Sequence, residues 1–150
     1  MDVQKIGGSI YGNVRVFTLQ QATAMIPLLE SITQNISQTW AAIIVKRVEL
    51  EAFEKLKADQ AAIQKLKEEL NWLIDKINGY IKEIEELGCF VEEFKRGIIN
   101  ITTLFNGRKV FFCWKLGETA VVYWHELDEG FNDRVTIKRT SDFFSEEVRL

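Results

Sequence analysis

The residues best suited to chemistry are gathered in one short stretch that holds the only histidine of the chain. In order along the chain they are His125, Glu126, Asp128, Glu129 and Arg134. An imidazole beside carboxylates can bind a divalent metal through nitrogen and oxygen ligands, and it can equally act as a general acid and base. We take His125, Glu126 and Asp128 as the candidate metal ligands, and no other cofactor is indicated.

A structural role is the competing interpretation of the same residues. His125 would then form a hydrogen bond to a carboxylate, because structural ion-pair networks use the same groups as active sites. Arg134 would bridge to Asp128 or Glu126 and so tie the loop. Glu118, at the far turn of the same hairpin, is a second loop-tying group. Both interpretations stay open, and an enzyme is the less favoured of the two.

Two predicted strands, 109–114 and 119–126, must position these residues. Gly117 between them fits the first central position of a two-residue type II′ turn. The resulting pairs are Trp114 with Val121, Phe112 with Tyr123 and Val110 with His125. This register places His125 and Cys113 on opposite faces, so a Cys–His metal or nucleophile pair is not expected within one chain. Both faces of the hairpin are apolar, and both must therefore be covered.

A long helical hairpin is predicted before the strands. Residues 28–77 contain no glycine or proline, and their apolar residues recur with helical spacing. Two apolar seams differ in phase around Asp59, which can act as an N-cap. We therefore expect two antiparallel helices that turn near residues 57–60. One uninterrupted helix is the alternative, because no residue forces a turn, and it would be about 100 Å long at about 1.5 Å per residue.

The ends of this helical region carry their own signals. Thr18 precedes Gln21 by three residues, as a capping box requires. Pro27 removes one hydrogen bond and is expected to kink the helix in its second turn. Gly88 is expected to end the second helix as the glycine that follows its C-cap.

The second apolar seam predicts a surface for self-association. Its residues alternate in spacings of four and three over more than three heptads, which is typical of a coiled coil. The residues assigned to this interface are Leu66, Leu70, Leu73 and Ile77. Because one helical hairpin and one small sheet leave too much apolar surface uncovered, we expect a homo-oligomer, most simply a twofold dimer.

From Cys89 onward the apolar period changes to two, which is typical of strands. Strands are predicted over 89–94 and 98–104, and Asn106 followed by Gly107 is the strongest hairpin signal in the chain. The fold class is therefore α+β, a long antiparallel helical hairpin packed with a small, mostly antiparallel sheet. The expected parts of this single domain, 1–150, are an arm (1–16, with a short strand at 13–16), a helical hairpin (17–88), a β-meander (89–134) and a tail (135–150, with a short helix starting at 140–142).

Composition argues against several classes of protein. The formal net charge is −3, whereas nucleic-acid binding needs a concentrated basic face. No segment approaches the roughly 20 apolar residues that span a bilayer, and we expect no signal peptide. Cys89 and Cys113 are not in a C-x-x-C motif, so we expect a reduced, cytoplasmic protein without a zinc site of that type.

Several segments resemble a prokaryotic family known as domain of unknown function 2203. The similar segments are Val16-Phe17-Thr18-Leu19-Gln20-Gln21-Ala22, Ile26-Pro27-Leu28-Leu29, Ile84-Glu85-Glu86-Leu87-Gly88-Cys89, Gly97-Ile98-Ile99, Gly107-Arg108-Lys109-Val110, Cys113-Trp114-Lys115-Leu116-Gly117-Glu118 and Trp124-His125-Glu126-Leu127-Asp128-Glu129-Gly130-Phe131. The resemblance covers about residues 16–134, and its last segment is the most specific. It implies the fold outlined above and a bacterial cytosolic setting, but no established activity.

The chain departs from this family pattern at one informative place. Where the pattern has Asp-Phe-Pro, this sequence has Asn100-Ile101-Thr102. An acid that would have joined a site is therefore absent, which weakens the metal or acid–base interpretation. The sequence favours a self-associating interaction or scaffold protein, with itself or an unidentified protein as partner. The alternative is a small metal-binding or acid–base enzyme that uses His125.

Overall fold

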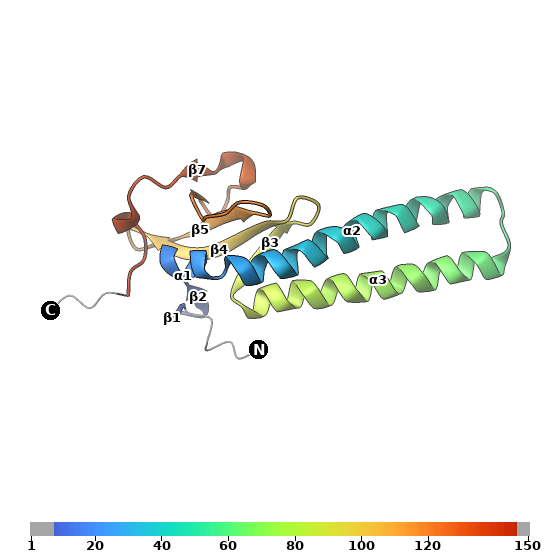
Figure 1. Cartoon of the computed structure of the whole chain (residues 1–150), viewed down its shortest axis with the longest axis horizontal. Coiled ribbons are helices and arrows are strands. Elements are labelled where there is room, and N and C mark those ends of the chain that lie inside the picture. The colour runs from blue at the N-terminus through green and yellow to red at the C-terminus, as the bar shows by residue number, and fades with distance from the viewer. Residues whose placement is uncertain (1–7, 147–150) are drawn as a thin grey trace.

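The computed structural model describes residues 8–146, in which a long helical hairpin projects from a small sheet (Figure 1). The elements are β1 (Ser9–Tyr11), β2 (Val14–Val16), α1 (Leu19–Ala24), α2 (Ile26–Lys55), α3 (Gln60–Glu86), β3 (Cys89–Glu93), β4 (Ile98–Phe105), β5 (Arg108–Lys115), β6 (Tyr123–His125) and β7 (Val135–Thr136). Strands β3 to β7 form one antiparallel sheet in sequence order. The predicted α+β class is confirmed, and the two long helices are separate rather than continuous.

The helical region begins as its sequence predicts. The Thr18 hydroxyl accepts a hydrogen bond from the Gln21 backbone N–H at 3.0 Å, and the Gln21 side chain accepts one from the Thr18 N–H at 2.9 Å. The helix then breaks at Met25 instead of kinking, and Pro27 lies in the first turn of α2. A proline fits there because the N–H groups of a first turn have no partner within the helix.

The hairpin turns over residues 56–59, as expected. Asp59 occupies the N-cap position of α3, but its side chain makes no capping hydrogen bond. Gly88 follows the end of α3 with a φ of +91°, a left-handed conformation that glycine adopts without strain. An ion pair of 2.8 Å between Lys46 of α2 and Glu69 of α3 bridges the two helices.

The structure uses the predicted interface residues inside one chain. Leu66 and Ile77 are buried, and Leu70 and Leu73 are partly buried against the core. These four residues form the seam along which α3 packs on α2 of the same hairpin. They are therefore not a free surface for a second copy, which corrects the interface that we predicted from the heptad spacing.

The loop before β6 corrects the predicted register of the β5–β6 pair. The Glu118 N–H donates to the Lys115 carbonyl at 3.0 Å, so Gly117, with a φ of +100°, is the third residue of the turn and not the second. The chain then runs irregularly as far as Tyr123, and the predicted strand 119–126 shortens to three residues. The observed pairs are Phe111 with His125, Phe112 with Trp124 and Cys113 with Tyr123.

This register differs from the predicted one by a single residue, and such a shift moves every side chain of a strand to the other face. Cys113 and His125 consequently lie on the same face of the sheet. The opposite face carries Cys89, Ile99, Ile101, Phe112 and Trp114, which pack with Leu29, Ile36 and Ile84 of the helices in the hydrophobic core. The molecule thus has one helical layer on one face of the sheet.

Segments near both ends of the described chain form hydrogen bonds with the C-terminal half of β4. The Phe17 N–H donates to the Thr102 carbonyl at 2.9 Å, and the Phe144 N–H donates to the Leu104 carbonyl at 2.9 Å. The expected strand near 13–16 corresponds to β2, and the expected helix start at 140–142 is a single 3-10 turn. Residues 1–7 of the predicted arm and 147–150 of the tail lie outside the described residues. Within 8–146, no helix is both long and apolar enough to span a membrane.

Candidate functional site

His125 lies on the sheet face that is turned away from the helices and is only 1% exposed. Its Nδ1 is 2.8 Å from the Glu126 carbonyl oxygen, and its Nε2 is 3.1 Å from Oδ1 of Asn100. The Glu126 carbonyl oxygen and the Asn100 amide oxygen both accept hydrogen bonds, and the tautomer of the ring decides which of its nitrogens donates. Both ring nitrogens are therefore engaged within the chain.

Glu92 is a member of this network that the sequence analysis missed. Its Oε1 accepts a hydrogen bond from Nδ2 of Asn100 at 2.9 Å and lies 3.3 Å from Nε2 of His125. Its Oε2 accepts from the backbone N–H of Phe131 at 2.8 Å. The pairing of β3 with β4 is irregular between Val91 and Glu93, which leaves Glu92 outside the regular register. No local sequence pattern predicts such an irregularity, and two consecutive glutamates, Glu92 and Glu93, are expected to be solvent-exposed.

Asn100 occupies the position at which the resemblance led us to expect an aspartate. Its amide nitrogen donates to Glu92 while its amide oxygen faces His125, so it joins the two ionisable groups. A carboxylate at this position would lie against that of Glu92, and like charges at such a distance disfavour ionisation of both. An amide, which both donates and accepts, suits this place beside Glu92.

The structure does not bring the three predicted metal ligands together. The Glu126 carboxylate turns to Arg108, whose Nε and terminal nitrogen donate at 2.8 and 3.1 Å. Only the backbone carbonyl of Glu126 contacts His125. Asp128 is exposed. Among residues 8–146, no group of three or more His, Cys, Asp or Glu residues is placed to hold a metal ion.

Arg134 and Glu118 both tie the loop, as predicted, and they do so by pairing with each other. The predicted partners of Arg134, Asp128 and Glu126, were wrong. Its two terminal nitrogens donate to the two carboxylate oxygens of Glu118 at 3.0 and 2.6 Å. Burial lowers the pKa of Arg134, but the hydrogen bonds and charge of Glu118 outweigh this effect, and the pKa lies above its ordinary value. The guanidinium also lies 3.9 Å from the centre of the Tyr123 ring, a favourable cation–π distance.

The two cysteines lie on opposite faces of the sheet. Burial raises the pKa of Cys113 to about 12, against the opposing charge of Arg134. Burial likewise raises the pKa of Cys89 to about 12. Since the thiolate is the reactive form of cysteine, neither residue is a nucleophile at neutral pH in this conformation.

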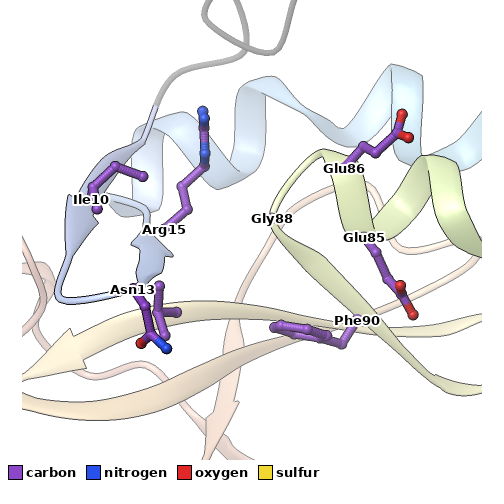
Figure 2. Close-up of a pocket in the computed structure, with 8 residues that line it drawn as sticks. Ile10, Asn13, Arg15, Glu85, Glu86, Gly88 and Phe90 are labelled. Atoms are coloured by element: carbon purple, nitrogen blue, oxygen red, sulfur yellow. The ribbon is translucent and has the colours of Figure 1, made fainter.

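Two surface cavities lie away from this network. One, of about 260 Å³, is lined by the β1–β2 hairpin, the end of α3 and the start of β3. Figure 2 shows Arg15 of β2 on one side of Gly88, and Glu85 and Glu86 of α3 on the other. The second cavity, of about 370 Å³, lies at the tip of the helical hairpin beside Lys57. His125 and Glu92 line neither of them.

The arrangement around His125 therefore links several elements of the fold, and neither of these two cavities reaches it. It connects β3, β4 and β6 with the segment after β6 through hydrogen bonds that the chain itself satisfies. A search of curated proteins and a search of solved structures each found no match. The family model described as "Uncharacterized conserved protein (DUF2203)" matches residues 15–137. The chain belongs to this DUF2203 family, as the segments from Val16 to Phe131 indicated.

Proposed function

We propose that this protein is a self-associating interaction or scaffold protein, and that the outer face of α2 pairs with the same face of a second copy. The support for this proposal is that α2 is apolar on two sides. Its inner side holds Leu29, Ile36 and Ile43, which are buried in the hairpin and the core. Its outer side exposes Ile44 by 41%, Val45 by 56% and Val48 by 62%.

These exposed residues do little to stabilise α2 itself. Isoleucine and valine are branched at Cβ, lose side-chain freedom in a helix and have a lower helix propensity than alanine or leucine. Exposed on the side of α2 away from the core, they also make little contact with the rest of the chain. A contiguous apolar surface of this kind is typical of an interaction site.

The residue pattern of this face favours a second copy as the partner. We call Ala41, Ile44, Val45, Val48 and Ala52 the outer stripe. Within it, Ala41, Val45, Val48 and Ala52 follow spacings of four, three and four, which suit helix-on-helix packing. The order Ala-Val-Val-Ala is the same in both directions. An antiparallel twofold pair would therefore set alanine against alanine and valine against valine, the self-complementarity that a twofold interface requires.

A reducing bacterial cytoplasm is the setting that we propose for this assembly. Cys89 and Cys113 lie on opposite faces of the sheet and cannot form a disulfide with each other. Unpaired buried thiols suit a compartment in which disulfides do not accumulate. The other candidate function, an enzyme at His125, has less support, because the ring is buried and both of its nitrogens are bound.

A charge in the outer stripe tests the proposal. Val48→Glu would place a carboxylate at the centre of the twofold contact, where its desolvation is costly. We expect light scattering coupled to size-exclusion chromatography to give a dimer for the wild-type protein and a monomer with unchanged helical content for the variant. Asn35→Glu adds the same charge on α2 outside the stripe and should leave the dimer intact. A monomeric wild-type protein, or a dimeric Val48→Glu variant, would refute the proposed contact.

A further inference from the structure

The segment 126–134, which we call the strap, lies across the sheet on the face that the helices leave free (Figure 1). Its regular structure is limited to one 3-10 turn, Phe131–Asp133. Most of its side chains are exposed: Leu127, Asp128, Glu129, Asn132 and Asp133. The strap therefore has no apolar core of its own, and contacts with the sheet must hold it in place.

The first attachment of the strap is the Glu92 carboxylate. This one side chain contacts three elements: Asn100 on β4, His125 on β6 and the backbone N–H of Phe131 in the strap. Its side chain is 25% exposed, so water reaches it from one side. Hydrogen bonds to a carboxylate are stronger than those between neutral groups, which makes Glu92 an effective anchor.

The second attachment uses arginines. The Phe131 ring lies between the guanidinium groups of Arg96 and Arg134, whose central carbons are 4.8 and 4.1 Å from the ring centre. Arg134 is in turn held by Glu118. Charged groups thus make both attachments, in contrast to the apolar packing that joins the helices to the other face of the sheet.

Beneath the strap lie the buried polar side chains of this face. Asn100 is 7% exposed, Cys113 0% and His125 1%. Arg134, at the end of the strap, reaches the Cys113 carbonyl with one nitrogen at 3.4 Å. The strap is thus positioned to keep water and solutes away from Cys113 and His125.

We infer that the strap is a releasable cover, that Glu92 is its latch, and that its opening exposes the Cys113–His125 face while helices and sheet stay folded. Segments held by a few solvent-accessible polar contacts open at a lower free energy than an apolar core, and they do so as local units. The single carboxylate of Glu92 holds both the underlying network and the strap backbone. Its loss therefore makes opening of the strap more frequent, while the contacts of Arg134 with Glu118 stay in place.

Cys113 serves as the reporter for a test of strap opening. In a Cys89→Ala background it is the one remaining cysteine of the chain, and its reaction rate with an aromatic disulfide reagent can be followed under native conditions. Adding Glu92→Ala should raise this rate by more than about tenfold, because the strap opens more often. Glu83→Ala is the control, since Glu83 is an exposed carboxylate on α3, and the helices lie on the other face of the sheet from the strap. This control should leave the rate within about twofold of the background.

Hydrogen exchange separates strap opening from global unfolding in the same variants. With Glu92→Ala, amides of residues 126–134 should exchange faster, whereas amides in the middle of α2 should keep the exchange rates of the background protein. The inference fails if Glu92→Ala leaves the Cys113 rate unchanged. It also fails if the amides of α2 accelerate together with those of the strap, because the whole molecule would then be opening.

Discussion

Cys89 shows how one buried group makes stability depend on pH. Its thiol lies fully buried on the helix-facing side of β3, and burial raises its pKa to about 12, although Arg15 acts in the opposite direction. In the unfolded chain a cysteine has a pKa of about 8.5. Above about that pH the unfolded state releases a proton that the folded state keeps. The stability from this thiol is therefore fully present below the unfolded pKa and is lost as the pH rises toward the folded pKa.

Cys89→Ala should remove this part of the pH dependence. Between the unfolded and folded pKa values, the thiol lowers the free energy of unfolding by up to about 1.4 kcal/mol per pH unit. Urea denaturation of wild type and variant at several pH values from neutral upward measures the two slopes. The variant loses packing at every pH, but its slope in the alkaline range should be shallower. Equal slopes would show that the thiol does not titrate differently in the folded state.

At the scale of elements, Gly97 allows the β3–β4 turn to pack against both α2 and the segment after β5. It lies in the turn between β3 and β4 with a φ of +67°. A Cβ atom placed there would lie 2.6 Å from Cγ2 of Thr33 on α2 and 2.8 Å from Cβ of Leu116 after β5. Both the backbone conformation and the close approach exclude a side chain without local movement. This glycine thus lets α2 pack closely on the turn.

Gly97→Ala should therefore cost more stability than a glycine substitution where space is open. Gly117 has a φ of +100°, and a Cβ there would have no atom within 4 Å. Gly117→Ala should cost only the left-handed backbone strain, about 1–2 kcal/mol. Gly97→Ala should cost that amount plus roughly 1 kcal/mol or more for the steric clash. Chemical denaturation of both variants measures the difference, and equal losses would mean that Thr33 and Leu116 move aside at no cost.

At the scale of the whole molecule, the C-terminal tail closes one end of the core. Phe143 is 5% exposed, and its ring centre lies 5.2 Å from those of Phe105 and Phe112 and 5.7 Å from that of Trp124. Glu146 contacts Ser9 and Gln21, so the tail also meets the beginning of the described chain. Residues far apart in sequence therefore complete the same core.

Phe143→Ala should reduce global stability and free the tail. Removing a buried phenylalanine side chain costs about 3–5 kcal/mol when the cavity does not collapse. We expect this loss in urea denaturation, together with faster proteolysis within residues 135–146. Val135→Ala, at a position that is 50% exposed, should change the free energy of unfolding by less than about 0.5 kcal/mol. A loss of similar size in both variants would contradict a core role for Phe143.

The sequence by itself determined the elements that depend on neighbouring residues. Helical spacing predicted the two long helices, alternation and the Asn106-Gly107 turn predicted the β4–β5 hairpin, and Thr18 with Gln21 marked the first helical turn. Each of these signals acts within a few residues, so its outcome does not depend on the rest of the fold. The segments from Val16 to Phe131 likewise identified the family.

Only the tertiary structure decided which surfaces and side chains meet. The turn at Gly117 set the register of β6, and a shift of one residue moved His125 to the face of Cys113. The irregular pairing of β3 then brought Glu92 to Asn100. The seam around Leu70 and Ile77 could have joined two chains or two helices of one chain, because the hydrophobic effect is non-directional and does not specify the partner. These outcomes depend on long-range geometry, in which one inserted or displaced residue changes every later contact.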